Sequence, residues 1–284
     1  MRFFLAAIAL IATAPAAAEP GMWRVADADT EIILFGSIHE LPAGTVWLSP
    51  RIARRVDAAD TLVLETLIPE DRSVIGGLVA RLGYSPKLPK LETRVAPSKR
   101  GELFPAVRAA GLPMVALDAM ETWYAALTLG DAALQKLGFD PALGVEPALT
   151  ARFKKAAKPV IGLETPEQQL GYFDTLAETD QRALLDSTLD DVATAQADAT
   201  RLIAAWQAGQ TDVLAADFDR SMRATPRLAA VLVRERNARW AGWIAKRLAT
   251  PGKVFVAVGA AHLAGADSVQ TMLAAKGLKV ERLP

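Results

Sequence analysis

The stretches EIILFGSIH at residues 31–39 and KVFVAVGAAH at residues 253–262 share one plan and decide the fold. In each, an apolar run typical of a buried strand is followed by a glycine, and a histidine comes three residues after that glycine. Ligands bind at the carboxyl edge of open α/β sheets, so the pattern predicts that His39 and His262, the chain's two histidines, meet at such an edge. The simpler interpretation is that each glycine only ends its strand and each histidine is an ordinary rim residue.

Composition narrows the class of protein. The 284 residues include 32 Lys and Arg and 32 Asp and Glu, and neither sign forms a long block. The sequence therefore lacks the excess or cluster of positive charge that is typical of nucleic-acid-binding proteins. The absence of cysteine excludes disulfide frameworks and a lipid-anchored lipoprotein. Abundant Ala and Leu favour many helices around a modest sheet.

Residues 1–18 have the features of a secretory signal peptide: a short positive start, an apolar core at residues 3–12 and small residues at 16–18. The apolar core is too short for a comfortable permanent span, although an uncleaved anchor is the alternative. No later segment reads as a second span. We therefore expect a periplasmic or secreted protein, without a stable membrane span after cleavage, in which residues 19–284 form one domain.

The elements alternate in the α/β manner near the start of the chain. A strand at 31–35, a helix from the N-cap Ser49 to residue 59 and a strand at 61–65 form a predicted parallel βαβ unit, which would place Glu65 on the strand next to that of His39. Helices follow at about 71–82 and 98–110, and residues 114–117 read as a third short strand.

The middle of the chain, about 120–250, reads as a large helical insertion interrupted by one strand at 158–164. Thr165 is the expected N-cap of the helix after that strand. After the second histidine phrase, a helix at about 267–275 and an edge strand at 278–283 are predicted. The fold class is therefore α/β, with a mixed, largely parallel central sheet flanked by helices.

Four side chains are predicted to converge at the carboxyl edge of this sheet: His39, Glu65, Glu164 and His262. Two neutral imidazoles with one or two carboxylates are a common ligand set for a catalytic divalent metal, and a spare carboxylate suits a general base. The spacing matches no compact metal motif. Helix capping or an arginine ion pair are the alternative roles of the two glutamates.

The charged phrase at residues 234–240 supplies a candidate arginine. Most such charges form a solvated helix face, but one arginine turned inward, such as Arg236, would steady a carboxylate or an anionic oxygen.

These phrases together resemble the TraB/GumN family, which is related to the Tiki metalloproteases. The similarity covers nearly all of residues 19–284 and includes, in order, residues 34–39, 61–65, 144–146, 158–165, 235–240 and 255–262. The resemblance implies a site made of the paired GxxH phrases, a glutamate and an arginine, and, from the Tiki branch, peptide cleavage that depends on a divalent metal such as manganese or cobalt. Carried over, His39, Glu65 and His262 fall on the most specific positions. Glu146 departs from the aspartate expected at its position.

The leading hypothesis is an exported hydrolase, most plausibly a peptidase acting on a peptide or protein substrate. His39, Glu65 and His262 would gather a divalent ion (manganese, cobalt or zinc), Glu164 would act as acid/base, and Arg236 would stabilise developing negative charge. The alternative is a non-catalytic protein that sequesters a peptide or a small ligand such as haem. A third class, a helical interaction module, has no heptad or repeat array to favour it.

Overall fold

The computed structural model describes residues 19–223 and 225–284 and confirms a mixed α/β fold. The predicted signal peptide lies outside the described residues. The strands are β1 (Met22–Ala26), β2 (Thr30–Ser37), β3 (Leu41–Pro42), β4 (Thr61–Thr66), β5 (Phe139–Asp140), β6 (Val160–Glu164), β7 (Gly252–Gly259) and β8 (Val280–Arg282).

The helices fill most of the remaining chain. The α-helices are α1 (Pro50–Ala58), α2 (Arg72–Leu82), α3 (Leu91–Arg94), α4 (Arg100–Ala110), α5 (Met114–Asp118), α6 (Thr122–Lys136), α7 (Val145–Lys155), α8 (Pro166–Asp174), α9 (Glu178–Gln207), α10 (Thr211–Ser221), α11 (Pro226–Ala229), α12 (Glu235–Arg247) and α13 (Val269–Ala275). The short turns are η1 (Pro97–Lys99), η2 (Pro141–Leu143) and η4 (Ala260–Leu263), which are 3₁₀-helices, and η3 (Ala230–Arg234), which is a π-helix.

The main sheet has the strand order β6-β4-β7-β2-β1-β8. Strands β6, β4, β7 and β2 are parallel, and β1 pairs antiparallel with both β2 and the edge strand β8. The two histidine-bearing strands β2 and β7 pair directly along their whole length, from Thr30 opposite Gly252 to Ser37 opposite Gly259. The strands of the two histidine phrases therefore end at the same edge of the sheet, as predicted.

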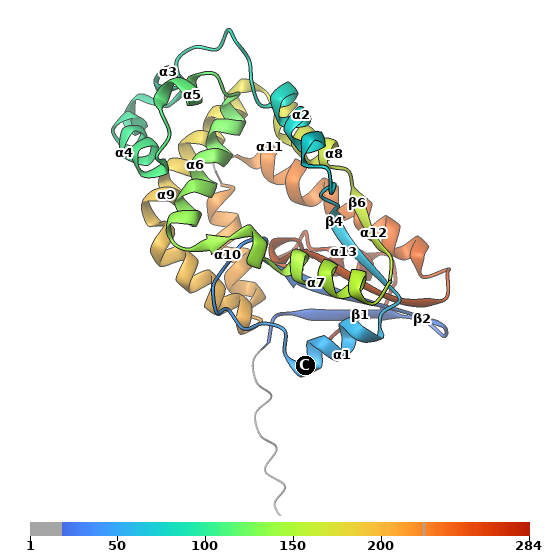
Figure 1. Ribbon diagram of the computed structural model, residues 1–284. Coiled ribbons are helices and arrows are strands. Elements are labelled where there is room, and N and C mark those ends of the chain that lie inside the picture. The colour runs from blue at the N-terminus through green and yellow to red at the C-terminus, as the bar shows by residue number, and fades with distance from the viewer. Residues whose placement is uncertain (1–18, 224) are drawn as a thin grey trace, which may run out of the picture.

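Helices cover both faces of the sheet, which is why β2, β4 and β7 are nearly continuous apolar runs. One face packs against α1, α7, α10 and the end of α9, and the other packs against α12 and α13. A third apolar cluster joins α3 to α6 with α9, and Figure 1 shows these helices gathered away from the sheet.

Local sequence explains the helix starts that follow the strands. Ser49 caps α1 by accepting the amide of Ile52, with Pro50 at the first helical position. Thr165 caps α8 in a reciprocal capping box with Gln168. Both predicted caps are confirmed.

Two expectations about the sheet are wrong. Residues 114–117 are not a strand but part of α5, because Leu117 buries itself in the helical cluster and a four-residue apolar run fits either structure. In addition, β2 and β4 are not neighbours. Strand β7 lies between them and pairs in parallel with both, an order set by packing between distant segments and not by local pattern.

Within the described residues, no helix is both long enough and apolar enough to cross a membrane.

Candidate functional site

The carboxyl edge of the four parallel strands brings the predicted residues together. Glu164 is the last residue of β6, and Glu65 lies one residue before the end of β4. His262 follows β7 in η4, and His39 lies two residues beyond β2. The edge therefore presents these side chains in the order Glu164, Glu65, His262, His39.

Arg236 of α12 joins the two glutamates in a buried network. Its Nη2 atom donates to Glu65 Oε2 at 2.5 Å and lies 2.9 Å from Glu164 Oε2, while its Nε atom lies 3.1 and 3.0 Å from the two Glu164 oxygens. All three residues are buried. A buried arginine that compensates two carboxylates is much harder to remove than a surface ion pair.

The network fixes the charge of Glu65. Burial by itself raises the pKa of Glu65, but the neighbouring His262, Arg236 and His39 and the amide of Gly259 outweigh burial and lower this pKa to about 2. The pKa of Arg236 is raised, because its attraction to Glu65 and Glu164 exceeds the desolvation that opposes it. Glu65 is therefore ionised at neutral pH despite its burial.

His262 is held by a side chain that the sequence did not point to, Asn237. The Asn237 amide group donates to the carbonyls of His262 and Asp267 at 3.3 and 2.7 Å, which directs its oxygen toward His262 Nδ1 at 2.6 Å. Since an amide oxygen only accepts, Nδ1 carries the proton and Nε2 is left with its lone pair. Nε2 lies 3.2 Å from Arg236 Nη1 and 3.6 Å from Glu65 Oε1.

His262 is also kept neutral. Burial lowers its pKa to about 4, even though the charge of Glu65 acts in the opposite direction. The Trp240 ring packs against the imidazole with 4.5 Å between ring centroids. At neutral pH the ring is thus in the form that a metal ion or a hydrogen-bond donor can use.

His39 has a different environment, because 62% of its side chain is exposed. Its Nδ1 atom lies 2.8 Å from Oε1 of Glu146, which lies in the first turn of α7. Desolvation lowers the pKa of His39, but the hydrogen bond and charge of Glu146 outweigh it and raise this pKa to about 9. Free His39 is therefore charged at neutral pH, and a metal would have to displace the proton on Nε2.

Gly259 marks the point where the three predicted metal ligands approach one another. A Cβ atom at this position would lie 3.2 Å from Glu65 Oε1, 3.5 Å from His39 Nε2 and 3.6 Å from His262 Cδ2. The Gly259 amide also donates to Glu65 Oε1 at 2.7 Å. Glycine suits this close approach, since a methyl group would crowd Glu65 Oε1 and lie in van der Waals contact with both histidines.

The donor set suits a divalent metal, but the groups are not closed around one. Within the described residues, no three His, Cys, Asp or Glu side chains form a cluster tight enough to hold a metal ion. The Arg236 guanidinium instead contacts both Glu65 and His262. A metal bound by two imidazole Nε2 atoms and a Glu65 oxygen would compete with Arg236 for these contacts.

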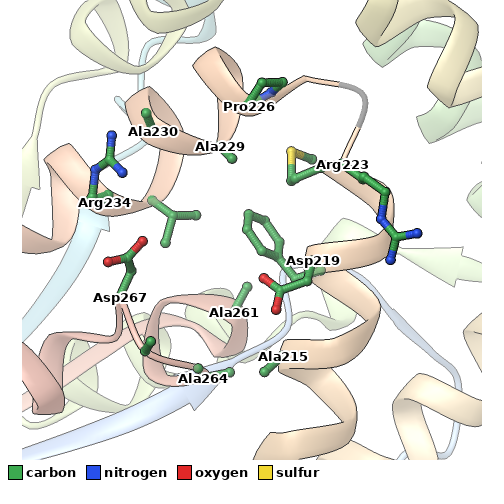
Figure 2. A pocket seen from close by; sticks show the side chains of 15 residues that line it. Ala215, Asp219, Arg223, Pro226, Ala229, Ala230, Arg234, Ala261, Ala264 and Asp267 are labelled. Atoms are coloured by element: carbon green, nitrogen blue, oxygen red, sulfur yellow. The ribbon is translucent and has the colours of Figure 1, made fainter.

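Two further residues hold Glu164. Tyr172 Oη and Trp240 Nε1 donate to Glu164 Oε1 at 3.0 and 3.1 Å. The two other arginines of the phrase have different places: Arg239 is half exposed and donates to Tyr172, while Arg234 lines the pocket shown in Figure 2. Trp240 follows Arg236 by four residues, so helical spacing is a signal that places these two on the same side of α12; Asn237, one residue after Arg236, has no such signal.

A pocket of about 350 Å³ lies on the other side of η4. Figure 2 shows Arg234 and Asp267 on one side of it and Asp219 and Arg223 on the other, with small side chains such as Ala261 and Ala264 on its floor. Residue Ala261 immediately precedes His262, so the pocket and the candidate site share a wall.

The chain is similar in sequence to known proteins. The model of the TraB/PrgY/gumN family matches residues 21–282. The chain is similar to the uncharacterized protein YbaP of Escherichia coli (strain K12) and to that of Shigella flexneri, with 28% identity over 244 residues, which cover 84% of this chain and 86% of each relative. No solved structure matches.

Proposed function

This chain belongs to the TraB/PrgY/gumN family, and from the chemistry of its site we propose that it is a hydrolase that cleaves peptide bonds with the help of a divalent metal ion. The observation that carries the proposal is the approach of Glu65 Oε1, His39 Nε2 and the His262 ring around Gly259. Two imidazoles and one carboxylate leave a coordination position for water, as catalytic sites require.

The proposed ligands are His39 and His262, each through Nε2, and Glu65 through Oε1. When bound, a divalent ion would lower the pKa of a water molecule and polarise the carbonyl of the scissile bond. Manganese, cobalt and zinc are the candidate ions, and the resemblance to the Tiki branch favours manganese or cobalt.

In this proposal Arg236 stabilises the developing negative charge. Its Nε and Nη2 atoms are directed at the glutamates, whereas Nη1 donates to the carbonyl of Leu232 and faces His262 Nε2. If His262 Nε2 bound a metal ion, the N–H group of Arg236 Nη1 that now faces His262 would be free to donate to a substrate oxygen. A cationic donor that is already in place and shielded from water contributes strongly to such stabilisation.

The contacts of Glu164 suggest a role different from the acid/base predicted from sequence. Donors from Arg236, Tyr172 and Trp240 surround its oxygens, so it accepts hydrogen bonds as an oriented carboxylate. We propose that Glu164 orients Arg236. Glu164→Gln distinguishes the acid/base role from the orienting role. An acid/base role predicts that the variant loses the corresponding limb of the pH–rate profile. An orienting role predicts a lower rate with both limbs retained.

We also propose that the protein is exported, on the strength of residues 1–18 alone. A peptidase in the periplasm or outside the cell would meet peptide and protein substrates there. N-terminal sequencing of the protein recovered from a periplasmic fraction tests this step.

The decisive experiment measures metal content and cleavage of a mixed peptide library by the purified chain without residues 1–18. The proposal predicts metal-dependent cleavage that His39→Ala and His262→Ala abolish, while Arg234→Ala, which changes an exposed arginine outside the contacts of the proposed ligands, has little effect. Equal cleavage by the wild type and both histidine variants would contradict it. Stoichiometric capture of a peptide or of haem without any product would favour the sequestering alternative instead.

A further inference from the structure

Glu146 contacts His39 although the two residues come from distant parts of the chain. His39 lies in the loop after β2, and Glu146 lies in the first turn of α7. Their contact joins Glu146 Oε1 to His39 Nδ1 at 2.8 Å. A side chain that binds Nδ1 decides which ring nitrogen remains free for other work.

The position of Glu146 is fixed by several independent contacts. Ser37, fully buried at the end of β2, donates from its hydroxyl to the same Oε1 atom at 2.5 Å. The amide of Val145 donates to the carbonyl of Ile38 at 3.1 Å. Gly144 packs so closely on the chain at His39 that a Cβ atom would lie 2.0 Å from the His39 carbonyl oxygen. The start of α7 is therefore locked against the loop that carries His39.

Stability alone does not account for this arrangement. Because 62% of the His39 side chain is exposed, water screens this ion pair, and it contributes less to folding than the raised pKa of His39 alone would suggest. The second oxygen of Glu146 is buried and has no hydrogen-bond partner among the described residues, which is unfavourable. A carboxylate kept in such surroundings is better explained by what it does to the ring.

The same geometry recurs at the other histidine. Asn237 offers an oxygen to His262 Nδ1 at 2.6 Å, as Glu146 does to His39. When either ring is in its neutral form, the oxygen at Nδ1 favours a proton on Nδ1. The Nε2 lone pair is then left on the side of Glu65. Oxygen acceptors behind metal-binding histidines act in this way, and losing one weakens metal binding by about 10-fold to 100-fold.

We propose that Glu146, oriented by Ser37, is a positioning residue that holds the proton of neutral His39 on Nδ1 and directs Nε2 toward Glu65. The expected effect of Glu146 on metal binding rests on the proposed function, whereas its effect on the proton position of the His39 ring does not.

The presence of only two histidines makes the ring states directly measurable. With ¹⁵N-labelled histidine, long-range ¹H–¹⁵N NMR spectra report which nitrogen of each ring carries the proton, and His39→Ala assigns the signals. Spectra are recorded without metal at about pH 10, because the pKa of His39 is raised to about 9. The expected wild-type result is a proton on Nδ1 in both rings.

Glu146→Leu is expected to convert His39 to a mixture with Nε2–H, while His262 keeps its signal as an internal control. Two milder variants, Glu146→Asp and Ser37→Ala, keep a carboxylate near His39. Each should give a fraction of Nε2–H tautomer between those of the wild type and Glu146→Leu, so the test still holds if the leucine variant misfolds. Titration with Mn²⁺ alone should show affinity falling about 10-fold to 100-fold in Glu146→Leu.

Wild-type His39 with its proton on Nε2, or a His39 tautomer unchanged in Glu146→Leu, would overturn the inference. Retained Mn²⁺ affinity in a variant whose tautomer has changed would also overturn the positioning role. If wild type binds no Mn²⁺ yet the tautomer responds as expected, the proposed function fails while the role of Glu146 in holding the ring stands.

Discussion

Replacing Arg236 with methionine should destabilise the fold by about 3–5 kcal/mol, the range observed when one partner of a buried ion pair is removed. Methionine retains much of the apolar stem that packs near Trp240, so the substitution chiefly removes charge and hydrogen bonds. Glu65 and Glu164 would then be buried side by side without their cation. The lost cation–π contact with Trp240, 4.6 Å from the ring centroid, accounts for a smaller part, about 1–2 kcal/mol.

The assay is urea unfolding at pH 7 of wild type, Arg236→Met and the exposed control Arg234→Met, for which a change within about 0.5 kcal/mol is expected. The difference should shrink in acid. Wild-type stabilisation through Glu65 is complete above the ordinary pKa of 4.5 and is lost as the pH falls toward the folded-state pKa of about 2. In the variant, burial without the arginine raises the pKa of Glu65, so protonation restores stability.

A double variant, Arg236→Met with Glu65→Gln, should recover part of the loss because one buried charge is gone. A loss below about 1 kcal/mol at pH 7, or a loss that stays constant down to acidic pH, would refute the buried-network argument.

Three other perturbations follow from the structure. Gly259→Ala places a methyl group 3.2 Å from Glu65 Oε1 and should lower Mn²⁺ affinity, measured by calorimetry, by about tenfold or more; unchanged affinity would show that the ligands do not meet there. Gly242→Ala, in α12 with no atom within 4 Å of the new methyl group, should instead raise the unfolding free energy by about 0.5–1 kcal/mol in urea titrations. Burial and the neighbouring Asp217, Asp190 and Asp198 raise the pKa of Asp191 from 3.8 to about 6, so wild type loses stability as the pH rises through this interval. Asp191→Asn should therefore be more stable at pH 7 by about 1 kcal/mol, after discounting the two-unit shift for solvent exposure, and the gain should vanish below about pH 4 in thermal unfolding.

The candidate site was largely predictable because its residues follow strand ends. Apolar runs before Glu65, Gly36 and Gly259 indicate buried strands, and the run before Glu164 indicates a further strand, which forms the more exposed edge of the sheet. The ends of parallel strands meet at one edge whatever their order. The order itself was not predictable, since the place of β7 between β2 and β4 depends on packing between distant segments. Local pattern also failed at residues 114–117, where four apolar residues fit a helix as well as a strand.

The residues that support the histidines were harder to find. Glu146 looks like an ordinary acidic residue in the first turn of a helix, which is favourable for reasons unrelated to His39. Asn237 lies in a charged phrase in which the arginines, and not an uncharged amide, are the ordinary candidates for a functional site. Their roles depend on contacts between α7 and β2 and between α12 and η4, which no spacing in the sequence encodes.

The central claim, that His39, Glu65 and His262 gather one metal ion, is tested most directly by anomalous X-ray diffraction from crystals soaked in Mn²⁺. The account predicts a single strong peak beside Gly259, about 2 Å from Nε2 of both histidines and from Glu65 Oε1, with Arg236 Nη1 moved away from His262. Strong Mn²⁺ peaks elsewhere on the molecule, with Arg236 still in contact with His262 and no peak beside Gly259, would contradict it.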